Sequence, residues 1–247
     1  MPDPRLLAAL RCLDLTSLGE DDTPERIDAL CRAAASPGDA LPPVAAVCVS
    51  ARFVGQARSL LTGTGVRVAC ATGAFPSGRL DTAGRVAEIA AALEAGADEI
   101  DTVLDHRAVV EGRMTEVLAQ LVASREACGT VTMKVILETG ALPSLAQVRS
   151  AAALALDAGA DFLKTSTGKV HPGATPEAVL AIAEVVRVAG TTTGIKVSGG
   201  VRTVQDAIGY LGLVTRHLGA AWGTHERFRI GASSLLDALV SALAAPD

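Results

Sequence analysis

The chain has 247 residues, 49% of them hydrophobic and only 2% aromatic, with a formal net charge of −5 at pH 7. This length suits one large α/β domain, and the acidic balance offers no electrostatic footprint for nucleic acid. The longest apolar run, residues 40–49, is far shorter than the roughly 20 residues of a membrane helix, and the N-terminus lacks the apolar core of a secretory signal. We therefore expect a cytoplasmic protein that binds neither nucleic acid nor membrane.

Cysteine and histidine spacing argues against a metal or disulfide framework. The 5 cysteines are scattered without a CxxC pair, and the 4 histidines form no HExxH motif. We expect no metal and no cofactor, and this disfavours a metal-dependent enzyme.

Short β-type runs alternate with longer, alanine-rich amphipathic stretches along the whole chain. Helices are expected in the intervals, for example over residues 79–94, 144–157 and 176–189, the last opened by an N-cap at Thr175 and Pro176 at its first position. The expected strands are residues 12–15, 45–49, 66–69, 99–103, 132–137, 162–164, 194–197 and 229–230.

Eight such units without a linker predict a single (β/α)₈ TIM barrel over residues 1–247, with a short N-terminal helix. An open doubly wound sheet is the alternative, and the lack of a GxGxxG motif after the first strand disfavours it.

An internal similarity sets the register of two strands. Residues 95–101 resemble residues 158–164, two βα units of about 30 residues each further along the chain. Asp101 and Lys164 thus occupy equivalent positions. Because side chains alternate along a strand, both are expected to face the barrel interior near its catalytic end.

Two lysines close neighbouring strands where burial of a charge is costly. Lys164 and Lys196 would enter one cavity, and ammonium groups about 4 Å apart repel by roughly 4 kcal/mol at an effective dielectric near 20. One amine could then be neutral and form a Schiff base with a carbonyl, while Asp101 moves protons. A set of structural ion pairs, Asp101 with one lysine, remains the alternative.

The loops after the last three strands are rich in glycine and hydroxyl side chains. Such loops let backbone N–H groups approach a phosphate, and barrels commonly bind phosphate after strands seven and eight. Ordinary turn and cap chemistry would account for any single glycine. The candidate residues are Thr167, Gly168, Lys169, Gly199, Gly200, Gly231, Ser233 and Ser234.

The motifs Lys-Thr-Ser-Thr-Gly at 164–168 and Lys-Val-Ser-Gly-Gly at 196–200 resemble the 2-deoxyribose-5-phosphate aldolase family of class I aldolases, and the similarity covers nearly the whole chain. The resemblance implies a (β/α)₈ barrel without a cofactor that cleaves deoxyribose 5-phosphate reversibly to glyceraldehyde 3-phosphate and acetaldehyde. It implies Lys164 as the imine-forming nucleophile, Lys196 as the charged neighbour that lowers its pKa, and Asp101 as the proton relay. Lys169, Gly199, Gly200, Ser233 and Ser234 match the family's phosphate-binding positions.

The chain departs from that family in two places. Some members end in a tyrosine that assists proton transfer, whereas this chain ends in Ala-Ala-Pro-Asp and its only tyrosine, Tyr210, lies in an expected helix. Ser50 and Ala51 follow the second strand without the proline found there in the family.

Other residues receive weaker expectations. Thr16 and Asp14 are candidates for substrate hydroxyls, with one of the two expected to point outward, and Cys48 could line the cavity, although an inert buried thiol is favoured. Lys134 is expected low in the barrel as a structural ion-pair partner, and His171 in a loop. The arginines expected on the solvated surface are Arg79, Arg85 and Arg202.

Two other functions remain open. One is a different phosphosugar barrel lyase or isomerase, such as another class I aldolase or a transaldolase. The other is a noncatalytic phosphosugar-binding barrel, in which the lysines only bind an anion. For the aldolase interpretation the expected partners are small phosphorylated sugars and aldehydes, and a homodimer or homotetramer is expected.

Overall fold

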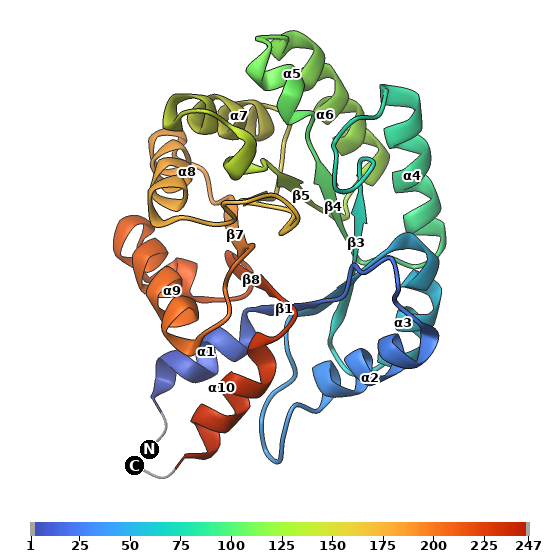
Figure 1. Cartoon of the computed structure of the whole chain (residues 1–247), viewed down its shortest axis with the longest axis vertical. Coiled ribbons are helices and arrows are strands. Elements are labelled where there is room, and N and C mark those ends of the chain that lie inside the picture. The colour runs from blue at the N-terminus through green and yellow to red at the C-terminus, as the bar shows by residue number, and fades with distance from the viewer. Residues whose placement is uncertain (1–2, 246–247) are drawn as a thin grey trace.

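The computed structural model describes residues 3–245, and its centre is a closed barrel of parallel strands in the order β1 to β8 (Figure 1). All the strands expected from the sequence are present. The strands are β1 Leu13–Thr16, β2 Ala46–Val49, β3 Arg67–Thr72, β4 Glu99–Val103, β5 Thr132–Ile136, β6 Phe162–Lys164, β7 Gly194–Ser198 and β8 Phe228–Ala232.

β1 and β7 run one residue past their expected ends, and two other strands run further. β3 continues to Thr72 and β8 to Ala232. Their additional residues are small or polar and carry no apolar alternation. Pairing with neighbouring strands, rather than local pattern, extends them.

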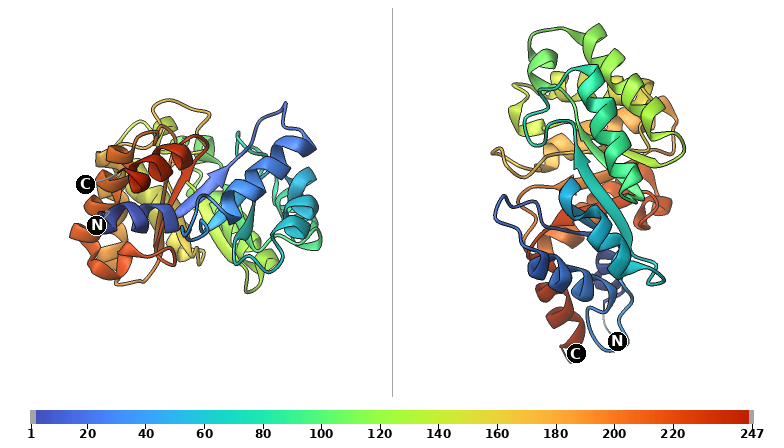
Figure 2. Two further views of the ribbon diagram at one scale, coloured as in Figure 1. Left: turned by 90° about the horizontal axis from the view of Figure 1, so that it is seen from below. Right: turned by 90° about the vertical axis from the view of Figure 1, so that its right-hand side faces the viewer.

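Helices surround the barrel and follow the strands in alternation (Figure 2). The helix expected over residues 176–189 has those bounds, whereas the one expected from residue 79 begins at Thr82, because the side chain of Asp81 caps it by accepting from the Gly84 N–H. The helices are α1 Pro4–Arg11, α2 Pro24–Ala35, α3 Val54–Leu61, α4 Thr82–Glu94, α5 His106–Val110, α6 Met114–Cys128, α7 Leu145–Asp157, α8 Pro176–Ala189, α9 Val204–Leu218 and α10 Leu235–Ala244, with short 3₁₀ turns η1 Ala51–Phe53, η2 Thr139–Ala141 and η3 Ala220–Gly223.

The first and last helices pack against each other beside the junction of β1 and β8 (Figures 1 and 2). The short N-terminal helix is thus confirmed, and it buries Leu6, Ala9 and Leu10. Burial of such an apolar stripe is what holds a short helix in place.

Strand register turns the charged residues to the inside of the barrel. Asp101 is paired with Lys134 on one side and Ala71 on the other, while Lys164 is paired with Lys196. Because directly paired residues of parallel strands face the same side, these side chains share the interior.

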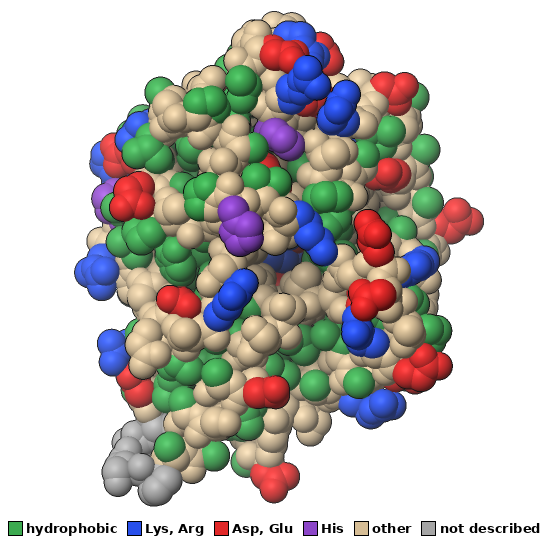
Figure 3. Space-filling view, viewed as in Figure 1, with side chains coloured by type: hydrophobic (Ala, Val, Ile, Leu, Met, Phe, Trp, Pro, Cys, Tyr) green, Lys and Arg blue, Asp and Glu red, His purple; other side chains and the backbone are tan. Residues whose placement is uncertain are grey.

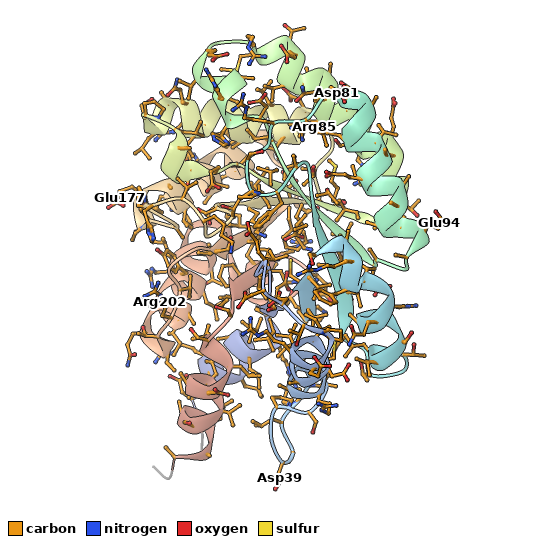
Figure 4. The ribbon with its side chains drawn as sticks, turned by 45° about the vertical axis from the view of Figure 1, so that its right-hand side comes forward. Asp39, Asp81, Arg85, Glu94, Glu177 and Arg202 are labelled. Carbon is orange, nitrogen blue, oxygen red and sulfur yellow. The ribbon has the colours of Figure 1, made fainter. Side chains whose placement is uncertain are left out.

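The expectation that Arg85 is a solvated surface residue is wrong. Arg85 is fully buried in α4 and donates to the carbonyls of Leu80, Val103 and Gly78, tying the loop after β3 to the end of β4 (Figure 4). A guanidinium has enough donors to satisfy three carbonyls at once, and helical periodicity gives no sign of such distant acceptors.

Two features are absent from residues 3–245. None of the helices described is long and apolar enough to cross a membrane. Nor, within the same residues, does any group of three or more His, Cys, Asp or Glu side chains lie so as to hold a metal ion.

Candidate active site

A cavity of about 320 Å³ opens at the carboxyl end of the barrel, among the loops that follow β1, β6, β7 and β8. Figure 3 shows a hollow near the centre of this face, bordered by lysine and arginine side chains. The structure brings nearly all the predicted substrate- and phosphate-binding residues to its wall: Thr16, Thr167, Gly168, Lys169, Gly199, Gly200, Gly231, Ser233 and Ser234.

Lys164 forms part of the cavity wall, and its ammonium nitrogen donates to Asp101 Oδ2 at 2.8 Å. Its side chain is 3% exposed. Lys196, which is fully buried beneath the cavity, donates to the same oxygen at 2.7 Å and also to Asp14. The two amines that the sequence places on neighbouring strands therefore meet at one carboxylate oxygen.

Lys134 occupies the other oxygen of that carboxylate. Its ammonium lies 2.8 Å from Asp101 Oδ1 and also pairs with Glu99, so its expected role as an ion-pair partner is confirmed. The alternative in which Asp101 forms an ion pair with one lysine therefore understates its contacts, because this carboxylate contacts three lysines.

Arg229 completes the buried charge network from β8. Its guanidinium donates to Asp14 Oδ1 at 2.7 Å and to Glu99 Oε1 at 2.8 Å. The buried members of the network are three carboxylates (Asp14, Glu99, Asp101) and four cationic side chains (Lys134, Lys164, Lys196, Arg229), and the exposed Arg67 also pairs with Glu99 at 3.4 Å.

Electrostatics keeps the enclosed part of this network ionised. Burial alone would raise the pKa of Asp101, but Lys134, Lys164 and Lys196 outweigh it and hold that pKa well below its usual range. Burial would likewise lower the pKa of Lys196, yet the carboxylates of Asp101 and Asp14 raise it above its ordinary value.

Glycine at 231 makes room for this arrangement. A Cβ atom there would lie 2.9 Å from Ser198 Cβ and 3.2 Å from Lys196 Cε, so a side chain would press on the stem of that lysine. In the loop after β7, Gly199 has a φ of +85°, a backbone conformation that residues with a side chain disfavour.

The loop after β6 is held by residues that sequence reasoning missed. The carboxylate of Glu138, itself at φ +52°, accepts from the backbone N–H of Thr167 at 3.2 Å and from its hydroxyl. Thr165 donates its hydroxyl to the Ser198 carbonyl at 3.0 Å and so joins the loops after β6 and β7. The polar run that follows β5 was the available signal for Glu138.

Two arginines in the cavity wall were also missed. Arg26 of α2 reaches it and pairs with the buried carboxylate of Asp22 at 3.2 Å. Arg202 is exposed, as expected, and also lines the same cavity. Helix patterning cannot show which exposed cations border a cavity formed by distant loops.

For Cys48 the structure agrees with the favoured alternative, and for Asp14 and Thr16 it corrects the expectation. Cys48 does not line the cavity: its thiol is fully buried, 3.9 Å from Asp101 Oδ2, and burial raises its pKa, as an inert thiol requires. The expectation that alternation turns either Asp14 or Thr16 outward is wrong, because residues two apart share a face. Asp14 lies in the charge network, and Thr16 lies in the cavity wall.

The expected positions of two loop and helix residues are confirmed. His171 lies in the loop between β6 and α8, and Tyr210 lies in α9. The Tyr210 hydroxyl donates to the Ala174 carbonyl at 3.0 Å and does not line the cavity. Of the chain end discussed above, residues 246–247 lie outside the described part.

Comparison with known proteins agrees with this geometry. The model of the DeoC/LacD aldolase family matches residues 9–239. A candidate deoxyribose-phosphate aldolase from Coccidioides immitis is 32% identical, with 96% of this chain and 87% of that chain covered and a TM-score of 0.82. One from Toxoplasma gondii is 27% identical over 98% of this chain and 97% of that chain, with a TM-score of 0.89. The tetrameric deoxyribose phosphate aldolase from Aeropyrum pernix is 26% identical over 97% of this chain and 92% of that chain, with a TM-score of 0.77. The chain belongs to the DeoC/LacD family of aldolases.

Proposed function

We propose that this protein is a deoxyribose-phosphate aldolase, which cleaves 2-deoxy-D-ribose 5-phosphate reversibly to D-glyceraldehyde 3-phosphate and acetaldehyde through a Schiff base on Lys164. One observation carries the assignment of the nucleophile. Lys164 is the cation of the buried network that opens on the cavity, whereas Lys134 and Lys196 are fully enclosed.

The contacts within the network support the same residue. Lys134, Lys196 and Arg229 each contact at least two of its carboxylates, whereas Lys164 contacts Asp101 alone. A Schiff base on Lys164 therefore replaces one ion pair of the network, and on either of the other two lysines it would replace more.

The opposite side of the cavity suits the phosphate of the substrate. Glycine-rich loops after β6, β7 and β8 offer backbone donors, and Ser233 and Ser234 stand at the N-terminus of α10. Lys169, Arg26 and Arg202 add positive charge to the rim. A volume of about 320 Å³ is at the small end of the range for ligand pockets, as a five-carbon phosphosugar requires.

The proposed chemistry uses the chain's own groups. The Lys164 amine attacks C1 of the open-chain sugar, and loss of water forms the imine. The imine accepts the electron pair of the C2–C3 bond as that bond breaks, and the C3 hydroxyl gives up its proton to become the aldehyde of glyceraldehyde 3-phosphate. C2 of the resulting enamine takes a proton, and water releases acetaldehyde and the amine. Asp101, ionised at rest, is the proton relay for these steps, directly or through water.

Borohydride trapping tests the nucleophile. Incubation with acetaldehyde and borohydride, followed by peptide mapping, is expected to show one ethyl group on Lys164 and none on Lys196. Lys169→Met is the matched control: it removes a cation at the rim, so trapping with acetaldehyde should persist while KM for the phosphorylated sugar rises. An adduct on Lys196, or none on Lys164, would contradict the proposal, and phosphosugar binding without any adduct would favour the noncatalytic alternative.

Assembly, location and pathway are part of the same proposal. The resemblance suggests a homodimer or homotetramer in the cytoplasm, acting in carbohydrate and deoxyribonucleotide catabolism. Light scattering of the purified chain decides between the two assemblies.

A further inference from the structure

A cavity of about 340 Å³ lies at the amino end of the barrel, among the residues at which β3, β5, β6, β7 and β8 begin. Because parallel strands run in one direction, this amino-end cavity is at the opposite end of the barrel from the candidate active site. Substrates of (β/α)₈ enzymes bind at the carboxyl end, so a ligand here would serve another purpose. Arginines and threonines prominent in its wall are Arg67, Arg227, Arg229, Thr132, Thr192 and Thr193.

Arg227 lines this cavity, and no carboxylate of residues 3–245 pairs with its guanidinium. Its Cζ lies 4.9 Å from the centre of the Trp222 ring, a cation–π distance. The Arg227 N–H donates to the Thr224 carbonyl at 3.0 Å, and the Arg227 carbonyl accepts from the Ile195 N–H at 2.9 Å. The backbone and the ring therefore hold this cation in place, and stacking on a ring leaves the N–H groups at the edge of a guanidinium free to donate.

Arg67 and Arg229 meet at one carboxylate oxygen beside the same cavity. Arg229 donates to Glu99 Oε1 at 2.8 Å, and a guanidinium nitrogen of Arg67 lies 3.4 Å from the same atom. Lys134 pairs with the other oxygen, Oε2, at 2.5 Å. The single negative charge of Glu99 therefore has three cations around it, and it balances only part of the positive charge at this end of the barrel.

The charge network as a whole has more cations than carboxylates. Its three carboxylates contact four cations even when Lys164 is left out, so positive charge is in excess whatever the protonation state of that lysine. These four cations are Arg67, Lys134, Lys196 and Arg229. Unbalanced charge in a barrel interior is unfavourable, and a counter-ion can reach the network at Arg67, whose side chain is 48% exposed.

The two acidic side chains in the wall of the amino-end cavity have other partners. Asp161 Oδ2 accepts from Arg125 at 2.7 Å and from the Met133 N–H at 2.8 Å. Glu226 is exposed and accepts from the Thr224 hydroxyl at 2.9 Å. In the described part of the chain, neither carboxylate pairs with an arginine of the cavity wall, so the positive charge there is left for a ligand.

We propose that the amino-end cavity binds a phosphate dianion, free or as the monoester of a small compound, between Arg67 and Arg227. Guanidinium groups bind phosphate through paired N–H donors, and the hydroxyls of Thr132, Thr192 and Thr193 offer neutral donors beside them. A volume of about 340 Å³ has room for a small monoester. The bound anion balances the excess charge of the network and stabilises the folded barrel. It takes no part in the aldol chemistry, so the inference does not depend on the proposed function.

Calorimetric titration with inorganic phosphate and with glycerol 3-phosphate, at constant ionic strength, tests this site. The Ser233→Asp chain is used, because its added carboxylate repels phosphate from the loops of the active site. That chain should still bind one phosphate, and Arg227→Met added to it should weaken binding by about tenfold or more, since a charge-assisted pair is lost. Arg149→Met, which replaces an exposed arginine of α7 outside both cavities, is the matched control and should leave the affinity unchanged. Tighter binding of glycerol 3-phosphate identifies a monoester as the occupant, and tighter binding of inorganic phosphate identifies the free ion.

Thermal unfolding gives a second measurement. Phosphate at about 100 times its Kd should raise the Tm of the Ser233→Asp chain by about 5–10 °C, and by much less once Arg227→Met is added. The general stabilisation that phosphate gives to folded proteins is common to both chains. Thr192→Glu, in an exposed loop, places a carboxylate in the cavity and should weaken binding as Arg227→Met does, so the test does not depend on one variant folding. No phosphate binding by the Ser233→Asp chain, the same affinity with and without the two cavity variants, or an equal loss in Arg149→Met would each overturn the site.

Discussion

Lys164 and Lys196 contact the same oxygen of Asp101, but their surroundings differ. Lys196 also contacts Asp14; against the effect of burial, Asp101 and Asp14 together raise its pKa above the ordinary value, and no part of it reaches the cavity. Lys164 has Asp101 as its single carboxylate partner in the described network and borders the cavity. Lys164, which can contact a substrate in the cavity, is therefore also the lysine with the fewest carboxylate partners.

Replacing Lys196 by methionine tests whether Lys196 serves as the permanent cation beside a reactive Lys164. Without that charge Lys164 becomes the cation that Asp101 and Asp14 require, so the amine should stay protonated at neutral pH. At an effective dielectric near 20, a unit charge about 4 Å away is worth roughly 4 kcal/mol, so activity at pH 7 should fall by about a hundredfold or more. The rate of adduct formation with acetaldehyde, measured against pH, should shift to the alkaline side.

Lys134→Met is the control for that variant. It also removes a buried cation from Asp101, but from the other carboxylate oxygen, so its pH profile should move less even if its stability falls as far. If Lys196→Met has near-normal turnover at pH 7 and an unshifted pH profile of adduct formation, the charge of Lys196 does not control the reactivity of Lys164.

At the scale of the elements, the strands contribute to the site through the loops that follow their carboxyl ends. β6, β7 and β8 each end in a loop of the cavity, and β7 and β8 lie so close at Ser198 and Gly231 that a single carbon atom would disturb their packing. The position of Lys196 thus depends on a neighbouring strand as much as on its own. A glycine inside a strand often marks such a close approach.

Gly231→Ala is expected to impair catalysis more than folding. The added methyl group would press on Lys196 Cε and Ser198 Cβ, and overpacking of this kind costs about 1–3 kcal/mol. The displaced ammonium should lower kcat while urea unfolding shows only that modest loss. Gly209→Ala in α9 is the comparison: a Cβ there meets nothing within 4 Å, so its stability should rise by about 0.5–1 kcal/mol with unchanged kcat. Equal kcat in the two variants would show that Gly231 does not position Lys196.

At the scale of the whole molecule, local sequence pattern predicts the fold, whereas many contacts of the site depend on closure of the barrel. Strand and helix alternation, and the similarity between two βα units, were enough to predict the barrel and to place Asp101 and Lys164 on one face. They could not predict the contact of Arg229 with Asp14, which are 215 residues apart, or the burial of Arg85. They also left open whether Cys48 lines the cavity, and they gave no sign that the exposed Arg202 does. Such facts depend on which loops and strand ends meet after the barrel closes, and no short stretch of sequence carries that information.

The buried charge network also makes the stability of the barrel depend on pH. The pKa values of Asp101, Asp14 and Glu99 lie below their ordinary 3.8, 3.8 and 4.5 in the folded protein, because the neighbouring cations outweigh burial. As pH falls through those ordinary values the unfolded chain takes up protons that the folded chain does not. The free energy of unfolding should therefore be level around neutral pH and fall below about pH 5, by up to about 1.4 kcal/mol per pH unit for each of these carboxylates.

Urea unfolding between pH 7 and pH 3 measures this dependence. Asp101→Asn should be less stable than the wild type at pH 7, since three lysines lose their shared carboxylate, but its stability should fall less steeply between pH 5 and pH 3 because one titrating group is gone. Asp39→Asn, in an exposed loop (Figure 4), should leave the steepness unchanged. If Asp101→Asn loses stability as steeply as the wild type, the acid sensitivity comes from other carboxylates, and the network at the barrel centre does not couple folding to pH.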